Sequence, residues 1–325
     1  MVVVVTGAAG HVGANLVRAL RERGLEVRGV DQRDPPPALA ALGASWVRAS
    51  IMDPPPLRAA FAGAEVVYHL AARISVTGDP DGRVRATNVD GVRNVAEAAL
   101  AAGVRRLVHC SSIHAFDLER CGETLDETGP RALAPRLPAY DRSKAAGEAA
   151  LRAVVERGLD AVIANPTGVI GPLDLGPSRM GRFFLALSDG RLPALVDGGF
   201  DWVDARDVAM TLIAAGELGR TGESYLVPGH WCSIRELAAL AQATTGVPAP
   251  RRVVPMTLAR AWGPIGTRLG RSSDNPLVFT GEALHALRFG PRVSGAKAEL
   301  ELGHTARPLE ESVRDLYAGF RELGA

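Results

Sequence analysis

The first thirteen residues restrict the fold of this 325-residue chain more than any other stretch. Val2 to Val5 is an unbroken β-branched run, which is typical of a strand buried on both faces of a parallel sheet. The segment Thr6 to Gly13 (TGAAGHVG) follows at once, and a helical pattern runs from Asn15 to Arg21. A strand, a glycine-rich turn and a helix in this order predict a dinucleotide site, because glycines let the backbone approach a pyrophosphate at the helix amino end.

The glycines of this turn are spaced by three and three residues, not by the two and three of the commonest dehydrogenase fingerprint. An ordinary tight turn is therefore an open alternative. The position directly after a buried strand favours cofactor binding. The turn residues expected to contact the cofactor are Gly7, Ala9, Gly10, His11, Val12 and Gly13.

An acidic residue closes the second expected strand, Leu25 to Val30. The carboxylate of Asp31 can accept hydrogen bonds from the adenosine ribose and would repel a 2′-phosphate, which favours NAD over NADP. Arg33 weakens this preference, because an arginine there could receive that phosphate. The alternative is that Arg33 is a solvated loop charge. Gln32 lies between them and is expected to contact the cofactor as well.

Two later segments are expected at the same crevice. Asp53 precedes three prolines, so it could cap a helix or face the adenine amino group. A fourth strand beginning at Glu65 runs into Leu70 and the small residues Ala71 and Ala72, which let the backbone approach a ligand, and all three are expected to contact the cofactor. We expect His69, within that strand, to be a packed histidine and not a catalyst.

A tyrosine and one of the chain's two lysines stand four residues apart, at Tyr140 and Lys144. Such residues share one face of a helix, so a phenol and an ammonium would face the same pocket. A nearby cation lowers the pKa of a phenol from its ordinary value of about 10. The fifth expected strand ends in Ser111 and Ser112, at the carboxyl edge where ligands bind. The alternatives are a chance pair on a surface helix and a serine that caps a turn.

Strands and helices alternate regularly until a sixth strand stops at Asn165. We therefore predict an α/β fold, a doubly wound parallel sheet with helices on both faces, followed by a smaller mixed α/β C-terminal lobe. The cofactor domain is expected at 1–165, with 202–215 returning to it, and the substrate lobe at 166–201 and 216–325. The arginines of that lobe, at 251, 252, 260, 268 and 271, favour a solvated helix face over an anion-binding patch.

Composition restricts the partners. A formal net charge of +1 gives no reason to expect nucleic acid or an acidic membrane surface. Three cysteines without a C-x-x-C spacing argue against disulfides and structural zinc, so we expect no metal and a reducing cytoplasm. The start of the chain lacks a basic signal region, and no apolar run approaches roughly 18 residues. We therefore expect the partner of this chain to be a small molecule.

Taken in order, Thr6 to Gly13, Asp31, His69 to Ala72, Ser112 and the Tyr140/Lys144 pair resemble the extended short-chain dehydrogenase/reductase superfamily over essentially the whole chain. The resemblance implies a Rossmann domain that binds NAD(P) and a smaller substrate lobe. It also implies that Ser112 hydrogen-bonds the substrate oxygen and that Tyr140 exchanges a proton with it. Lys144 would hold the nicotinamide ribose and lower the pKa of Tyr140. A homodimer packed through helices near 90–100 and 145–155 is implied as well.

The same resemblance extends to further residues. Asn88 resembles the family's helix asparagine and is expected to join the catalytic group. Additional cofactor contacts are expected from Ser111, Tyr140, Lys144, Asn165, Pro166 and Gly168. Substrate contacts are expected from Arg73, Ser112, Ile113, His114, Tyr140, Asn165 and Arg179.

Two segments depart from the nucleotide-sugar branch. The chain reads SSIHAFD from Ser111 where those enzymes tend to show SSxxVYG, and NPTGVIGP from Asn165 where they tend to show RPxNVYGP. It looks more like the dihydroflavonol-4-reductase-like and hopanoid-associated epimerase-like branch. This favours an NAD(P)-dependent oxidoreductase that interconverts a ketone or aldehyde and an alcohol. The alternatives are a sugar or nucleotide-sugar epimerase/dehydratase that recycles its NAD internally, and a non-catalytic NAD(H)-binding protein.

Overall fold

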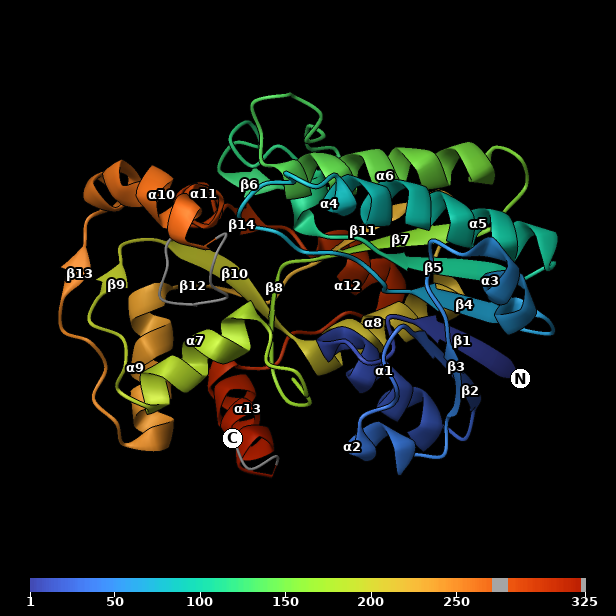
Figure 1. Cartoon of the computed structure of the whole chain (residues 1–325), viewed down its shortest axis with the longest axis horizontal. Helices are drawn as coiled ribbons and strands as arrows, with labels where there is room; N and C mark the ends of the chain where they lie inside the picture. Colours follow the sequence, from blue (N-terminus) through green and yellow to red (C-terminus); the bar gives the residue numbers. More distant parts are fainter. Residues whose placement is uncertain (271–279, 323–325) are drawn as a thin grey trace.

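Seven parallel strands form the central sheet (Figure 1). The structure is a computed structural model, and it describes residues 1–270 and 280–322. The strand order reverses between β1 and β4, the kind of switch point where ligands bind in such folds. In sheet order the strands are β11 (Ser224–Val227), β7 (Ala161–Pro166), β5 (Arg106–Cys110), β4 (Val66–His69), β1 (Val2–Thr6), β2 (Glu26–Asp31) and β3 (Ser45–Arg48).

Helices cover both faces of this sheet, as the valine run of β1 requires. Val3 and Val5 pack into one core layer and Val4 into the opposite one, and all three are fully buried. Burying each such side chain stabilises the fold by about 1.5–3 kcal/mol. On one face lie α1 (His11–Glu22), α8 (Ala205–Leu218) and α12 (Ala296–Leu302), and on the other α3 (Pro54–Phe61), α5 (Gly91–Ala101) and α6 (Ala139–Val155). The predicted doubly wound fold is confirmed.

A smaller lobe has its own core, drawn mainly from α7, α9, α13 and a second sheet. In this sheet β10 lies between an antiparallel and a parallel neighbour. Its strands are β12 (His230–Ser233), β10 (Gly199–Asp204) and β8 (Gly168–Ile170). The large helices of the lobe are α7 (Arg179–Ser188), α9 (Ile234–Thr245), α10 (Met256–Gly270), α11 (Gly281–Arg288) and α13 (Leu309–Glu322).

The remaining elements are short. Two-residue strands pair in parallel, β13 with β9 and β14 with β6. They span β6 (Thr124–Leu125), β9 (Leu195–Val196), β13 (Val253–Val254) and β14 (Arg292–Val293). The short helices are α2 (Pro37–Ala40), α4 (Arg83–Arg85), the π-helical turn η1 (Ala86–Asp90) and the 3₁₀ turn η2 (Ile113–Ala115).

The chain was expected to return to the large sheet at residues 202–215. The strand that does so, β11, comes later in the sequence. Strand β11, inside the segment 216–325, pairs in parallel with β7 and is buried throughout. Strand β10 instead belongs to the sheet of the lobe, although the residues after it form α8 against the large sheet. Without β11, β7 would be the edge of the large sheet with unpaired backbone groups. Pairing with β11 satisfies these groups, which explains why the chain comes back to the large sheet at residues 224–227.

Candidate active site

The glycine turn lies at the carboxyl end of β1 and is too tight for side chains. Gly7 has φ +70°, and a Cβ there would lie 2.6 Å from the backbone nitrogen of Ala71. A Cβ on Gly13 would lie 2.2 Å from the carbonyl oxygen of Gly7. Gly10 is different, since its Cβ would meet only that same oxygen, at 3.1 Å. Gly7 thus lets the loop after β4 approach the turn, Gly13 lets the helix pack on the turn, and Gly10 borders open space.

A cavity of about 300 Å³ opens beside this turn. Its lining is Gly7, Gly10, Val30, Asp31, Gln32, Arg33, Ala49, Ile51, Leu70, Ala71, Ala72 and Thr87. The expected cofactor residues of the first 72 positions supply most of this wall. Val30, Ala49, Ile51 and Thr87 were not anticipated, although Ala49 and Ile51 directly follow a strand and could have been found by that position. A glycine-walled cavity over a helix amino end fits a dinucleotide.

Asp31 is tied to the turn. One carboxylate oxygen accepts the backbone N–H of Ala9 at 3.0 Å. The other accepts the backbone N–H of Arg33 at 3.0 Å and lies 3.3 Å from its Nε. Because Arg33 pairs with Asp31, the cavity wall presents a neutralised pair and not a free cation.

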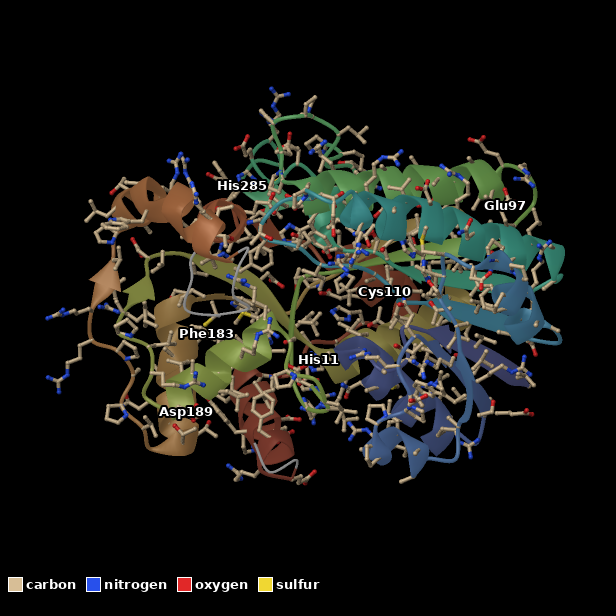
Figure 2. The ribbon with its side chains drawn as sticks, in the orientation of Figure 1. His11, Glu97, Cys110, Phe183, Asp189 and His285 are labelled. Atoms are coloured by element: carbon tan, nitrogen blue, oxygen red, sulfur yellow. The ribbon has the colours of Figure 1, made fainter. Side chains whose placement is uncertain are left out.

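Ala9 and Gly13 of the turn do not line this wall, and three further residues expected at the cofactor lie away from it. His11, labelled in Figure 2, does not line the cavity, and its Nε2 lies 3.0 Å from the carbonyl oxygen of Gly171, where the first helix meets the smaller lobe. Val12 packs against the core. Asp53 occupies the N-cap position of α3, but its exposed side chain makes no capping hydrogen bond and does not line the cavity.

The structure brings Ser112, Tyr140 and Lys144 together beyond the end of β5. Ser112 precedes η2, where its hydroxyl accepts the backbone N–H of His114 at 3.2 Å, and it lies near enough to the Tyr140 phenol to act on that phenol's pKa. Lys144, one helical turn further along α6, is buried, and its Nζ lies 3.4 Å from the carbonyl oxygen of Cys110. Figure 2 labels Cys110 near the middle of the molecule.

Burial controls the ionisation of this group. Burial raises the pKa of the Tyr140 phenol above its ordinary value, and the Ser112 hydroxyl partly opposes that rise. Burial also lowers the pKa of Lys144, with Cys110 and Glu148 acting in the opposite direction. The phenol is therefore protonated at neutral pH, which suits a proton donor.

Asn88 ties the catalytic helix to the loop after β4. It lies on the π-helical turn η1, and its Nδ2 donates to the Ser143 hydroxyl and to the carbonyl oxygen of Arg73, both at 2.9 Å. Its Oδ1 accepts the Arg73 backbone N–H at 2.8 Å. Ser143 in turn donates to the carbonyl oxygen of Tyr140 at 2.6 Å. Asn88 thus positions the first turn of α6, while the Arg73 side chain is exposed.

Asn165 holds the backbone of Ser112 through a hydrogen bond from its side-chain amide. Its fully buried Nδ2 donates to the Ser112 carbonyl oxygen at 2.9 Å and to Glu148 Oε1 at 2.6 Å. Glu148, on α6, lies 2.9 Å from the guanidinium of Arg131, which stacks over the ring of Phe116. The sequence pointed to Asn165 but not to these buried partners, because they become neighbours only in the folded chain.

The other expected contacts are set by packing. Ser111 is buried beside Ser112, and its hydroxyl has no hydrogen-bond partner among the described residues. Pro166 ends β7. A Cβ on Gly168 would lie 2.6 Å from the Trp202 ring, so this glycine admits a neighbouring strand. Ile113 is fully buried in the core of the lobe, and Arg179 begins α7.

His114 stands between the catalytic helix and the smaller lobe. Its Nδ1 lies 3.0 Å from a carboxylate oxygen of buried Asp141. Its ring meets the Tyr140 ring edge-on at 5.5 Å and stacks on Phe200 of β10 at 5.8 Å. A row of aromatic rings therefore runs from Tyr140 through His114 to Phe200 of the smaller lobe.

His69 is structural, as expected. It is fully buried, accepts or donates a 2.7 Å hydrogen bond with Thr6, and stacks on His109 of the next strand at 5.0 Å. Burial lowers its pKa to about 3. Across the described residues, no group of three His, Cys, Asp or Glu side chains could hold a metal ion. None of the described helices has the length and apolarity needed to cross a bilayer.

This chain is similar to known proteins in sequence and in fold. A 327-residue alignment covers all of this chain and 99% of sterol demethylase protein B of Methylococcus capsulatus, at 35% identity. A protein of Synechocystis sp. with the provisional name dihydroflavonol 4-reductase is 30% identical over 98% of this chain and 94% of its own length. The structure of a nucleoside-diphosphate-sugar epimerase from Pseudomonas aeruginosa superposes with a TM-score of 0.82, at 27% identity over 100% of this chain and 98% of that one.

Residues 3–227 match the family described as the NAD dependent epimerase/dehydratase family. The match runs from β1 through the glycine turn, the Ser112–Tyr140–Lys144 group and the last strand of the large sheet. The resemblance inferred from the sequence is confirmed. The chain therefore belongs to the NAD dependent epimerase/dehydratase family, within the extended short-chain dehydrogenases/reductases, and is an NAD(P)-dependent oxidoreductase.

Proposed function

We propose that this oxidoreductase reduces a ketone on a bulky apolar skeleton to a secondary alcohol, and oxidises that alcohol in reverse, with NAD as the preferred cofactor. The observation that carries the proposal is the grouping of Ser112, Tyr140 and buried Lys144 at the carboxyl end of β5, with the Tyr140 phenol kept protonated by burial. The glycine-walled cavity opens at the carboxyl end of β1 in the same sheet.

In this proposal Ser112 and Tyr140 bind the substrate oxygen together. The reduction adds one hydride to the carbonyl carbon and one proton to the oxygen. A bound nicotinamide dinucleotide supplies or accepts the hydride. Tyr140 donates the proton, and Ser112 hydrogen-bonds the oxygen as negative charge develops on it. Lys144 holds a hydroxyl of the cofactor ribose, while Asn88 positions the turn that carries Tyr140.

Asp31 supports the NAD preference. Its carboxylate is held at the end of β2 by two backbone N–H groups, on the wall of the cavity. A 2′-phosphate in that position would meet this negative charge. Arg33 is already paired with Asp31, which weakens it as a phosphate ligand.

The apolar substrate follows from the rings around Tyr140. His114 meets the Tyr140 ring, Phe200 of the smaller lobe stacks on His114, and Trp202 meets Phe200 edge-on. Flat apolar surfaces suit an alicyclic or aromatic ketone better than a hydrated sugar. The similarity to a protein named sterol demethylase protein B supports a bulky apolar substrate.

The test is NADH consumption by the purified protein with a panel of alicyclic ketones, aldehydes and sugar nucleotides, with Tyr140→Phe beside it. We expect one or more alicyclic ketones to drive consumption, and the variant to lose about 10²–10⁴-fold in kcat while still binding NADH. Tyr68→Phe is the matched control, since that phenol is buried against α8 on β4.

Two outcomes of the same panel would contradict the proposal. Isomerisation of a sugar nucleotide without net NADH consumption would identify an epimerase. NADH binding that Tyr140→Phe leaves unchanged, with no turnover of any compound, would identify a cofactor-binding protein.

We also infer a homodimer, packed through the outer faces of α5 and α6, in a reducing cytoplasm. The described cysteines Cys110, Cys121 and Cys232 are all free, which supports the second point. Sedimentation equilibrium of the purified protein gives the mass: twice the chain mass is expected, and a monomer would contradict the dimer.

A further inference from the structure

The positive charge of this chain is concentrated in one segment. From Leu237 to Ser273 the sequence has no aspartate or glutamate but five arginines, whereas the remainder of the chain has more acids than bases. The arginines are Arg251, Arg252, Arg260, Arg268 and Arg271, the last of which lies outside the described residues. A whole-chain charge of +1 therefore conceals a strongly basic segment.

This segment contains α10, which forms an outer edge of the smaller lobe, far from the central sheet (Figure 1). Leu258 and Trp262, four residues apart, lie on one side of the helix and are 58% and 67% exposed. Arg251, Arg252 and Arg268 are exposed and make no hydrogen bond or ion pair through their side chains with any described residue. Large apolar and cationic side chains thus face solvent together.

The inner side of the same helix borders a second cavity, of about 330 Å³. Gly263 and Thr267 line it from α10, and Leu284, His285 and Phe289 line it from α11 and the residue after it. Glu282 of α11 accepts the backbone N–H of Ala139, the residue before Tyr140, at 3.3 Å, so this cavity lies on the Tyr140 side of the lobe. A helix about 10 Å thick is all that separates it from the exposed leucine and tryptophan.

We propose that α10, with Arg251, Arg252 and Arg268, docks the protein on an anionic lipid bilayer. Leu258 and Trp262 would enter the interface. Tryptophan and leucine on one side of a helix with arginines beside them are the composition of interfacial helices. Charge complementarity favours anionic headgroups, because the patch carries only positive charge. This departs from the expectation drawn from net charge, because net charge does not register how charge is distributed.

The proposal deepens the proposed function and rests on it for one point, the apolar substrate. A bulky apolar ketone partitions into a bilayer, and a cavity behind a docked helix would receive it without passage through water. Docking itself is measured without turnover, so it can succeed or fail independently of the reductase assignment.

The experiment is co-sedimentation of the full chain with vesicles of phosphatidylglycerol and phosphatidylcholine in equal parts, against phosphatidylcholine alone, in low salt. We expect binding to the anionic vesicles only, and release in 0.5 M salt, because the Debye length falls to a few Å there. Arg251→Gln with Arg252→Gln should weaken binding by about fivefold per arginine. Trp262→Ala with Leu258→Ala should abolish the quenching of tryptophan fluorescence by brominated lipid.

Leu300→Ala and Trp231→Ala are the matched controls, because both side chains are exposed on other elements, α12 and β12. Both should bind vesicles like the unchanged protein, and every variant should still reduce a water-soluble ketone. Equal binding to both vesicle types, or none to either, would overturn the proposal. Retention on an acidic polypeptide column without vesicle binding would assign the patch to a protein partner instead.

Discussion

The glycine turn and the lobe-facing side of Tyr140 are built in opposite ways. The turn is local, since Gly7, Gly10 and Gly13 lie within seven residues and shape one wall through their missing side chains. The other surface combines His114 with Asp141 and with Phe200, which come from η2, α6 and β10. A local site can be read from spacing, whereas a site assembled from distant segments depends on the tertiary fold.

The largest expected effect lies in the local half. Gly13→Ala places a methyl group 2.2 Å from a backbone oxygen that cannot rotate away, so both the turn and the helix must shift. We expect NADH affinity to fall by about 100-fold and the free energy of unfolding to fall by about 1–3 kcal/mol, the usual cost of overpacking. Fluorescence titration measures the NADH affinity, and urea denaturation measures the free energy of unfolding.

Gly10→Ala is its matched control. The new methyl group would border the cavity and meet only one atom, at 3.1 Å, and the backbone there has φ −80°. Affinity should fall while the unfolding free energy stays within about 1 kcal/mol of the unchanged protein. If this variant binds NADH normally, the cavity beside the turn is not the cofactor site.

Asp31→Ser is the next largest change. Removing the carboxylate removes its repulsion of a 2′-phosphate and frees Arg33 to pair with that phosphate. The ratio of kcat/KM for NADH to that for NADPH should fall by about tenfold, equivalent to about 1.4 kcal/mol. Asp34→Ser serves as the control, because Asp34 is an exposed acid that pairs with Arg48. An unchanged ratio in Asp31→Ser would mean that the carboxylate does not face the ribose.

The sequence predicted the fold and most of the cavity wall, because both follow from local patterns. The valine run of β1 predicted burial on two faces, and the position after a strand predicted Asp31, Ala71 and Ser112. It could not show that Asn165 hydrogen-bonds Glu148, since the two lie 17 residues apart on different elements.

The same limit explains the expected residues that do not line the cavity beside the glycine turn. His11 matched the turn by position, but its ring finds the carbonyl of Gly171, 160 residues away, so only the folded lobe decides its direction. Strand β11 gave no separate signal of its place in the large sheet, because pairing partners are not encoded by a strand's own residues.

His114→Phe tests the assembled half and should have a smaller effect on turnover. The phenyl ring can keep the contacts with Tyr140 and Phe200, but the contact with Asp141 is lost and a buried carboxylate loses a partner. We expect KM for the ketone to rise about fivefold with kcat within about twofold, and stability to fall by about 1–3 kcal/mol.

The double variant His114→Phe with Asp141→Asn separates structure from recognition. It removes the unpaired charge, so stability should recover while KM stays high. Recovery of both would make the histidine a structural residue only.

The smallest expected effect, on the pH dependence of reduction, concerns Tyr140, where the two halves meet. The family resemblance implies that Lys144 lowers the pKa of the phenol, whereas in the structure burial raises it and the lysine ammonium lies against the Cys110 carbonyl. A raised pKa keeps the phenol protonated, so kcat for ketone reduction should change by less than about twofold between pH 7 and 9. Oxidation needs the deprotonated phenol, so its rate should rise about tenfold per pH unit over that range.

Both profiles come from initial rates in the two directions, with Tyr140→Phe as the background. A plateau in the oxidation rate below pH 9 would place the pKa of Tyr140 beneath its ordinary value. In that case the charge of Lys144, acting across one helical turn, outweighs burial once cofactor and substrate are bound. A rate that rises without a plateau means that burial dominates, and that the site is built to donate a proton more readily than to accept one.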